Sequence, residues 1–284
     1  MPRNTKVQAR IADVLAEVDR AIEQTEALLA KQQRIKTGLM HDLLTRGLDA
    51  QGRLRDPLTH RFKDSPMGKT PEDWGTPRLM DHADVMGGKR LPSGHNYSEA
   101  ETGCLYLRVT DFFRRRPVSE SMQRLQPATF AALQRYEIKD GDLYISIAGS
   151  LGYAGVFRDF SSYRVILTEN AARIRIRSGF EPDYLSAQIN GPLVQPQIDA
   201  EAGVGSGVPK LALYRIEGLR IPRPDETEQM EILKRLRALN SPISDSERIL
   251  AKLRRLKSGL MHDLLTGRVP VTPLLANPKA SISS

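Results

Sequence analysis

The sequence predicts an α+β fold, in which one mixed α/β domain is flanked by two long helices that form an antiparallel coiled coil. Two observations support this prediction. The octapeptide GLMHDLLT occurs at residues 38–45 and again at 259–266, and we call the spacing from Gly38 to Gly259 the repeat offset. Between the two copies, the pattern changes to short strand-like runs separated by glycines and polar residues. A repeat of this kind indicates that one structural unit is present twice.

Apolar residues recur at alternating intervals of four and three residues in both copies, as in the heptad seam of a coiled coil. The seam positions around the octapeptides are Leu29, Leu39, Leu43, Leu250, Leu260 and Leu264. Polar residues interrupt both seams at matched places, because Thr25 corresponds to Ser246 and Lys36 to Lys257. Polar seam residues are known to fix the register and the choice of partner.

Each helix of about 35–40 residues would be about 55 Å long. Pro242 lies inside the second helix and should kink it or break one turn. Two ordinary surface helices packed on a core are an alternative, since such apolar stripes are common. The near-identity of the copies instead favours two equivalent contact surfaces for two equivalent partners. His41 and His262 each stand without a second ligand at i+4, so we expect no metal site there.

Composition favours a polyanionic partner. The chain has 42 Lys and Arg against 34 Asp and Glu, a net charge of +8 and an isoelectric point near 9.6, which suits nucleic acid. Cys104 is the single cysteine, which excludes a disulfide within the chain and fits a reducing compartment. The N-terminal stretch lacks an apolar signal segment, and no apolar run approaches the length of a membrane span. We therefore expect a soluble, cytoplasmic protein without a membrane partner.

The pattern changes divide the chain into five segments. We expect a first coiled-coil helix over residues 1–47, a linker over 48–74, the α/β domain over 75–224, the second helix over 225–268 and a flexible tail over 269–284. The linker is polar, contains prolines and glycines and has no periodicity, so we expect no secondary-structure element in it. Trp74, the only tryptophan, should anchor the start of the domain.

Within the domain, alternating and apolar runs predict strands and short helices. The strands are expected over residues 104–109, 143–147, 154–157, 164–168 and 172–176, and the helices over 127–136 and 182–188. The stretch GDLYISIAGSLGYAGVF is typical of a strand, a tight turn and a second strand. Gly149, Gly152 and Gly155 do not match the dinucleotide fingerprint. A turn that needs positive φ is favoured, although a bare backbone could also allow close approach of another molecule.

Basic residues gather in stretches that are typical of loops. These residues are Lys89, Arg90, Arg108, Arg114, Arg115 and Arg116, with the aromatic residues Tyr97, Tyr106 and Phe113 nearby. Each could be an ordinary solvated surface, but together they could contact nucleic-acid phosphates and bases. We expect Lys89, Arg90 and the three arginines at 114–116 to lie near DNA phosphates. Arg108, Thr110 and Tyr153 are the candidates for base contacts, from their side-chain chemistry and their places beside expected turns.

The sequence lacks the motifs of adenine methyltransferases, nucleases and phosphate-binding loops. There is no Asn/Asp-Pro-Pro-aromatic tetrapeptide of an adenine methyltransferase, and Pro182-Asp183 and Pro224-Asp225 are not followed by the Asp/Glu-x-Lys of a nuclease. The GKT at residues 68–70 lacks the upstream glycine of a phosphate-binding loop. No His/Cys cluster has zinc spacing. The sequence therefore predicts a recognition module with no catalytic residues, metal or cofactor of its own.

The chain resembles the DNA-specificity subunit of type I restriction–modification enzymes. Two stretches are similar to that family's conserved regions: RIKTGLMHDLLTRGLDAQGRLRDPLTHRFKDSPMGKTPEDW and IPRPDETEQMEILKRL…RLKSGLMHDLLTGRVPV. Three more resemble landmarks of its target recognition domain: IKDGDLYISIAGSLGYAG, LTENAARIRI and VPKLALYRIEGLRIPRP. The resemblance covers most of the chain, and the two helical repeats are its most specific part.

This resemblance implies a non-catalytic subunit. A target recognition domain of the family recognises one half of a split site in double-stranded DNA, and its paired helices act as a spacer. The helices also dock two copies of an adenine methyltransferase (M) subunit, and a motor-nuclease restriction (R) subunit then joins the complex. AdoMet, Mg²⁺ and ATP are accordingly expected only on the partner subunits.

The chain departs from the family pattern in the number of recognition domains. The usual subunit alternates two such domains with two helices, whereas the order here is helix, one domain, helix. Such a half-length form could self-associate about a two-fold axis, pair with a separate half-subunit, or be a nonfunctional remnant. A different class of function is a scaffold or inhibitor that occupies the methyltransferase docking surface without recognising DNA.

Overall fold

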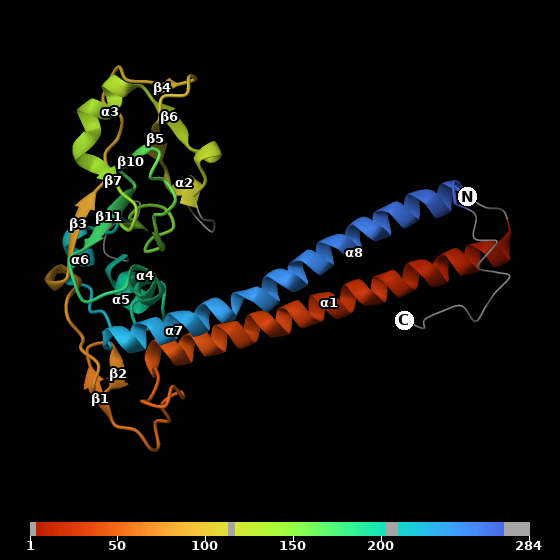
Figure 1. The fold of residues 1–284 in the computed structure, drawn as a ribbon, viewed down its shortest axis with the longest axis horizontal. Coiled ribbons are helices and arrows are strands. Elements are labelled where there is room, and N and C mark those ends of the chain that lie inside the picture. Colours follow the sequence, from red (N-terminus) through yellow and green to blue (C-terminus); the bar gives the residue numbers. More distant parts are fainter. Residues whose placement is uncertain (1–3, 113–116, 203–209, 270–284) are drawn as a thin grey trace. The chain divides into compact units, whose positions relative to one another are not determined.

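The computed structural model describes residues 4–112, 117–202 and 210–269 (Figure 1). The chain divides into two compact units. The first, here the coil unit, comprises Met1–Leu39 and Leu236–Ser284, and the second, here the globular unit, comprises Met40–Arg235. Each unit is considered by itself below.

The coil unit consists of most of α1 (Thr5–Thr45) and all of α8 (Asn240–Thr266), which lie side by side (Figure 1). Ile11 packs against Leu264, so the start of α1 meets the end of α8 and the pair is antiparallel. α7 (Glu226–Ala238) ends two residues before α8 begins. Pro242 therefore lies in the first turn of α8, where its missing N–H is tolerated, and the predicted break in the second helix is confirmed.

The heptad seam is the inner face of the helix pair. Leu250 and Leu264 are buried, and Leu29, Leu39 and Leu260 are half-buried. The remaining seam leucine, Leu43, is buried within the globular unit. The predicted antiparallel coiled coil is therefore confirmed.

Polar contacts cross between the two helices of the coil unit. Lys36 Nζ donates to Asn240 Oδ1 over 2.7 Å, and Lys257 Nζ lies 2.5 Å from Asp19 Oδ1. The two seam lysines therefore bring their charged ends to partners on the opposite helix, while their aliphatic stems can remain in the seam. Elsewhere along the pair, Arg254 forms an ion pair with Glu26 at 2.7 Å.

The globular unit contains three sheets. A five-stranded sheet has the order β4-β6-β5-β10-β7, a four-stranded sheet the order β3-β11-β8-β9, and β1 and β2 form a separate hairpin. The strands are β1 (Phe62–Ser65), β2 (Gly68–Pro71), β3 (Ala83–Gly87), β4 (Tyr97–Ser98), β5 (Cys104–Leu107), β6 (Gln123–Leu125), β7 (Glu137–Ile138), β8 (Leu143–Ser146), β9 (Ala154–Val156), β10 (Arg164–Leu167) and β11 (Ala171–Ile176). β5 and β10 are parallel, and the other paired strands are antiparallel.

Short helices connect these strands. They are α2 (Val109–Phe112), α3 (Pro127–Leu133), α4 (Pro182–Ile189), α5 (Gln195–Ala202) and α6 (Leu213–Gly218). All five predicted strands and both predicted helices are confirmed, with ends that differ by a few residues. The turn between β8 and β9 has positive φ at Gly149 and Gly152, as expected. Gly155 is required for a different reason, the lack of room for a side chain, because a Cβ there would lie 2.3 Å from the Tyr144 hydroxyl.

The expectation that residues 48–74 contain no element is wrong. β1 and β2 pair in register from Phe62 opposite Pro71 to Ser65 opposite Gly68. Ser65 Oγ donates to the Gly68 carbonyl over 2.6 Å, and Gly68 takes the positive φ that closes the turn. The hairpin was missed because its strands have only four residues each and are mostly polar, so no apolar alternation marks them.

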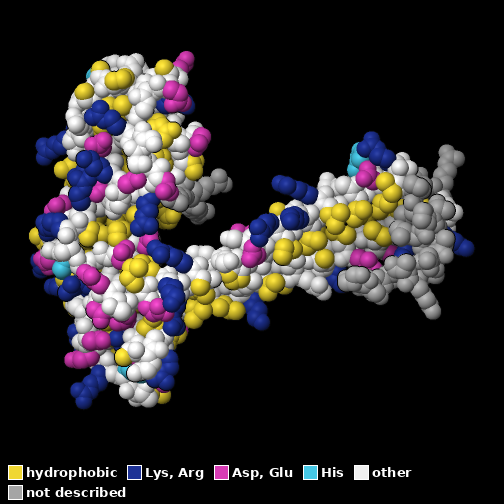
Figure 2. Space-filling view, in the orientation of Figure 1, with side chains coloured by type: hydrophobic (Ala, Val, Ile, Leu, Met, Phe, Trp, Pro, Cys, Tyr) yellow, Lys and Arg dark blue, Asp and Glu magenta, His cyan; other side chains and the backbone are white. Residues whose placement is uncertain are grey.

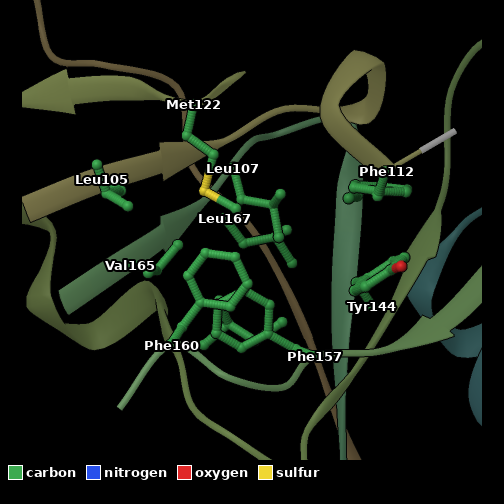
Figure 3. Close-up of a cluster of buried hydrophobic side chains, with 11 residues drawn as sticks. Leu105, Leu107, Phe112, Met122, Tyr144, Phe157, Phe160, Val165 and Leu167 are labelled. Atoms are coloured by element: carbon green, nitrogen blue, oxygen red, sulfur yellow. The ribbon is translucent and has the colours of Figure 1, made fainter. Parts of the chain in front are cut away.

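A large hydrophobic cluster joins the two main sheets (Figure 3). β5 and β10 contribute Leu105, Leu107, Val165 and Leu167, and Tyr144 of β8 approaches from the four-stranded sheet. The rings of Phe157 and Phe160 stack within it, with centroids 4.6 Å apart. Burying a large apolar side chain contributes about 1.5–3 kcal/mol, so this cluster holds the strand ends of both sheets in place.

Trp74 anchors the start of the domain, as predicted. Its side chain is fully buried and its Nε1 donates to Glu228 Oε2 over 3.1 Å. The same carboxylate lies 2.5 Å from the Arg55 guanidinium, which also contacts Asp73 at 2.7 Å. Gly47 ends α1 with positive φ, and a Cβ there would come within 2.3 Å of both Glu228 and Trp74. The expected glycine cap is therefore also required by this cluster.

Candidate nucleic-acid interface

A pocket of about 450 Å³ opens where β5 and β10 end. Because these strands are parallel, their carboxyl ends meet at one edge of the sheet. Arg108 directly follows β5, and Thr168 and Glu169 directly follow β10. We call this cavity the strand-end pocket. Its main polar and aromatic lining residues are Arg90, Tyr97, Tyr106, Arg108, Thr110 and Glu169.

Gly88 brings Arg90 to the pocket. After β3, the Gly88 amide donates to the Ala171 carbonyl and the Lys89 amide to the Leu167 carbonyl, both over 2.9 Å. A Cβ at Gly88 would lie 2.0 Å from the Thr168 carbonyl oxygen, so only glycine allows this close approach. The following residue, Arg90, therefore lies beside the end of β10.

Glu169 is the centre of the hydrogen-bond network in this pocket. Its Oε1 accepts from Arg90 Nε over 2.9 Å, and its Oε2 accepts from Thr168 Oγ1 over 2.9 Å and from the Tyr106 hydroxyl over 3.1 Å. Burial alone would raise the pKa of Glu169, but these hydrogen bonds outweigh it and the pKa is lowered. Burial raises the pKa of Tyr106. Glu169 is therefore an anion near neutral pH, and Tyr106 remains a donor.

Arg108 is held on the other side of the pocket. Its Nε and Nη2 donate to the two Asp111 oxygens over 3.1 and 2.8 Å, and Nη2 also donates to the Ser121 carbonyl over 3.2 Å. The Asp111 side chain is only 3% exposed. The hydrogen bonds that Arg108 donates to this carboxylate are the main cause of its raised pKa. One edge of the Arg108 guanidinium is therefore fully occupied inside the protein.

A second surface feature lies on the coil unit. Four apolar side chains at matched places remain 48–51% exposed: Leu28, Ile35, Ile249 and Leu256. Leu28 and Ile249 are separated by the repeat offset, as are Ile35 and Leu256. Each of these four residues directly precedes a seam residue in the chain. Glu26 and Arg254, which form an ion pair across the helices, instead each directly follow a seam residue. The four apolar side chains therefore lie on the side of the coiled coil opposite that ion pair, and we call them the apolar strip. Figure 2 shows hydrophobic side chains in a band along the two helices.

Two other features, a metal site and a membrane-spanning helix, are not found among the described residues. No three His, Cys, Asp or Glu side chains are placed together so that they could hold a metal ion. Among the helices of residues 4–112, 117–202 and 210–269, none combines the length and apolar character that crossing a membrane requires.

Sequence comparison finds specificity subunits. No protein-family model matches the chain. The type I restriction enzyme MjaVIII specificity subunit of Methanocaldococcus jannaschii is 23% identical over 274 residues, which are 94% of this chain and 61% of the relative. The putative MjaX specificity subunit of the same organism is 24% identical over 273 residues, or 93% and 57%. The chain thus spans about three-fifths of the length of these relatives.

Solved structures agree with this result. The HsdS subunit from Thermoanaerobacter tengcongensis matches 93% of this chain with 58% of its own, at a TM-score of 0.60 and 16% identity. A chain from a structural study of type I R-M complex assembly matches 93% of this chain with 60% of its own length, at a TM-score of 0.61 and 18% identity. The S subunit from M. genitalium matches 92% of this chain with 61% of its own length, at a TM-score of 0.52 and 14% identity. The chain is similar in sequence and fold to type I specificity subunits. The resemblance drawn from its motifs is therefore confirmed.

The structure brings some of the sequence-predicted DNA contacts together. Arg90, Arg108 and Thr110 share the strand-end pocket. Lys89 lines a neighbouring pocket of about 550 Å³ that also contains Arg90, Glu169 and Lys210. Arg114, Arg115 and Arg116 lie outside the described residues.

Tyr153 lies apart from the strand-end pocket. It is half-buried between β8 and β9 and packs against the hydrophobic cluster, with its ring stacked on Phe112 at 6.5 Å. Burial raises its pKa. This placement favours a structural contribution more than the base contact that we expected.

Sequence analysis missed Glu169, the residue that organises the pocket. The residues expected to contact DNA had basic, aromatic or hydroxyl side chains, whereas Glu169 is acidic. A signal was present, because Glu169 directly follows the predicted strand over 164–168. Its proximity to Arg90 could not be predicted, since the two are 79 residues apart in the chain.

Proposed function

We propose that this chain is a non-catalytic DNA-specificity subunit of a type I restriction–modification complex. The observation that carries the proposal is its similarity to specificity subunits over 94% of its length. The net charge of +8 and the strand-end pocket support a role in DNA binding. On this proposal, the chain directs adenine methylation, and the restriction coupled to it, to a chosen sequence.

The globular unit is the proposed target recognition domain. It recognises one half-site of a bipartite target in double-stranded DNA, and a second recognition domain from outside these 284 residues recognises the other. The strand-end pocket supports this role because side chains at strand ends reach outward from a rigid sheet. Lys89 and Lys210 are exposed beside it and could contact phosphates.

The coil unit is the proposed spacer and docking element. The apolar strip supports docking, because each of its two exposed apolar positions occurs twice, once on each copy of the repeat. Two copies of one methyltransferase subunit could therefore bind in equivalent ways. Complete burial of each half-exposed side chain would contribute about 1 kcal/mol. The R subunit then joins this complex, and AdoMet, Mg²⁺ and ATP bind to the partner subunits.

Mapping of methylated adenines would test this function. The full chain is expressed with its methyltransferase subunit, and methylated adenines are located across the host genome. We expect methylation at one sequence motif that disappears without this chain. Replacing residues 75–224 with the corresponding segment of another specificity subunit should change the motif but not the assembly. Assembly without any motif-directed methylation would contradict the proposal and indicate a scaffold or inhibitor.

A further inference from the structure

Arg90 and Arg108 both line the strand-end pocket, but their guanidinium groups are held differently. Asp111 and Ser121 occupy Nε and Nη2 of Arg108. Arg90 is held by a single hydrogen bond from Nε to Glu169, and its side chain is 79% exposed. Among the residues that the structure describes, neither terminal nitrogen of Arg90 has a hydrogen-bond partner.

This arrangement leaves the end of the Arg90 fork available. A guanidinium can donate two parallel hydrogen bonds through its terminal nitrogens to a matching pair of acceptors. Glu169 fixes the plane of the fork through Nε, and Tyr106 and Thr168 fix Glu169 in turn. The side chain is therefore oriented before a ligand arrives, which lowers the entropy lost on binding.

The charges in the pocket distinguish between two possible ligands of this fork. Arg90 and Arg108 carry two positive charges, and Glu169 and Asp111 carry two negative charges beside them. Inside the strand-end pocket, a phosphate would meet no net positive charge and would be repelled by Glu169 at close range, whereas Lys89 and Lys210 line the neighbouring pocket. The major-groove edge of guanine is uncharged and presents two acceptors, O6 and N7, at the spacing of an arginine fork. The pocket thus favours a base edge over a phosphate.

We infer that Arg90 recognises a guanine in the DNA target through its terminal nitrogens, and that Glu169 is the positioning residue for Arg90. This inference rests on the proposed function, since it names a residue that determines specificity within it. It also changes the role expected for Arg90 from the sequence, which was a phosphate contact. Arg108, with its fork edge occupied by Asp111, is not the guanine contact.

The test compares sequence preferences of variants in the assembled complex. The full chain, with its methyltransferase subunit, methylates a library of DNA duplexes with randomised bases, and the preference at every position is read by sequencing. For the wild type, we expect one position at which guanine is preferred by about 5- to 150-fold, the range of a good bidentate contact. Arg90→Ala should reduce that preference to near one while other positions keep theirs.

Two further variants separate the fork from its support. Arg90→Lys keeps the charge but not the planar fork, so it should also lose the preference for guanine. Glu169→Gln leaves Arg90 in place but weakens its orientation, so the same position should relax by a smaller factor. Arg124→Ala is the matched control. Arg124 lies on β6 of the same sheet, forms an ion pair with Glu101 and does not line the pocket. Its preferences should match the wild type.

Several outcomes would overturn the inference. An unchanged preference pattern for Arg90→Ala would show that Arg90 does not contact a base. Equal weakening at all sequences, with a smaller salt dependence, would show a phosphate contact instead. If the wild-type complex shows no sequence preference at all, the proposed function itself fails. Arg90 is exposed, so its variants should fold, and thermal melting of each variant checks this.

Discussion

Lys257 and Asp19 form an ion pair across the coiled coil, with Nζ and Oδ1 2.5 Å apart. The equivalent contact occurs once more, between Lys36 and Asn240. Lys36 and Lys257 are equivalent positions of the repeat, as are Asp19 and Asn240. The helix pair therefore makes the same cross-helix contact from each copy of the repeat. A slip by one heptad would move both lysines about 10 Å away from these partners, so the two contacts specify a single register.

Replacing both seam lysines should stabilise the coiled coil and make its register less specific. We expect Lys36→Leu/Lys257→Leu to raise the free energy of unfolding by about 1 kcal/mol, because apolar seam residues stabilise coiled coils. Register is measured by oxidation of a cysteine pair placed at Glu26 and Arg254, which are in contact across the helices. The double variant should cross-link less completely than the wild type. A lower stability with unchanged cross-linking would contradict this role.

Glu228 should be the most sensitive position of the anchor around Trp74. Glu228→Ala removes the main partner of the buried Arg55 side chain and the acceptor of the Trp74 N–H. Breaking one side of a buried ion pair costs about 3–5 kcal/mol, and the remaining contact with Asp73 should keep the loss at about 3 kcal/mol. Urea unfolding measures it. Glu226→Ala, at an exposed position of the same helix, should change stability by less than about 0.5 kcal/mol.

The hydrogen bonds of Glu169 should make stability depend on pH in one direction. The pKa of Glu169 in the folded protein lies below its ordinary value of 4.5. The unfolded state therefore binds more protons around that pH, and stability rises with pH. The contribution should be complete above pH 4.5 and disappear as the pH falls through the folded-state pKa. The stability difference between wild type and Glu169→Gln, from urea unfolding, should accordingly shrink from neutral to strongly acidic pH. A constant difference would exclude this linkage.

The apolar strip should determine binding of the methyltransferase subunit. Leu28→Asp/Ile249→Asp places two charges on the strip, and we expect at least about a tenfold loss of affinity, since burying an unpaired charge is costly. Ala30→Asp/Ala251→Asp is the matched control, because these exposed alanines are also one repeat offset apart and lie off the strip. Calorimetry measures both, with helicity checked by circular dichroism. Equal effects of the two pairs would place docking elsewhere.

The sequence predicted best where one local pattern determines the structure. The heptad seam placed Leu250 and Leu264 correctly inside the coil, and apolar runs located β5, β8, β9, β10 and β11. The strands β1, β2, β4 and β7 have two to four residues and are mostly exposed or half-exposed, so no apolar alternation distinguished them from loops. Their pairing could not be inferred from so few residues.

The same reason limited prediction of the site. Arg90 and Arg108 were recognised as candidates from their charge alone. The carboxylates that determine which of their nitrogens are available, Glu169 and Asp111, could be assigned only from the fold. Gly88 likewise gave no distinctive signal, because its importance lies in a close approach to Thr168, which is distant in the chain.

At the strand-end pocket, residues that pack the core lie next to residues that face the pocket. Leu107 and Leu167, the last residues of β5 and β10, belong to the hydrophobic cluster, and Arg108, Thr168 and Glu169 follow them directly and line the pocket. A change at Arg90 or Thr110 would therefore alter the chemistry of the pocket without disturbing the packing beneath it. Such an arrangement makes the preferred ligand easy to change by mutation, and a lineage carrying this scaffold could acquire new targets while its stability stays constant.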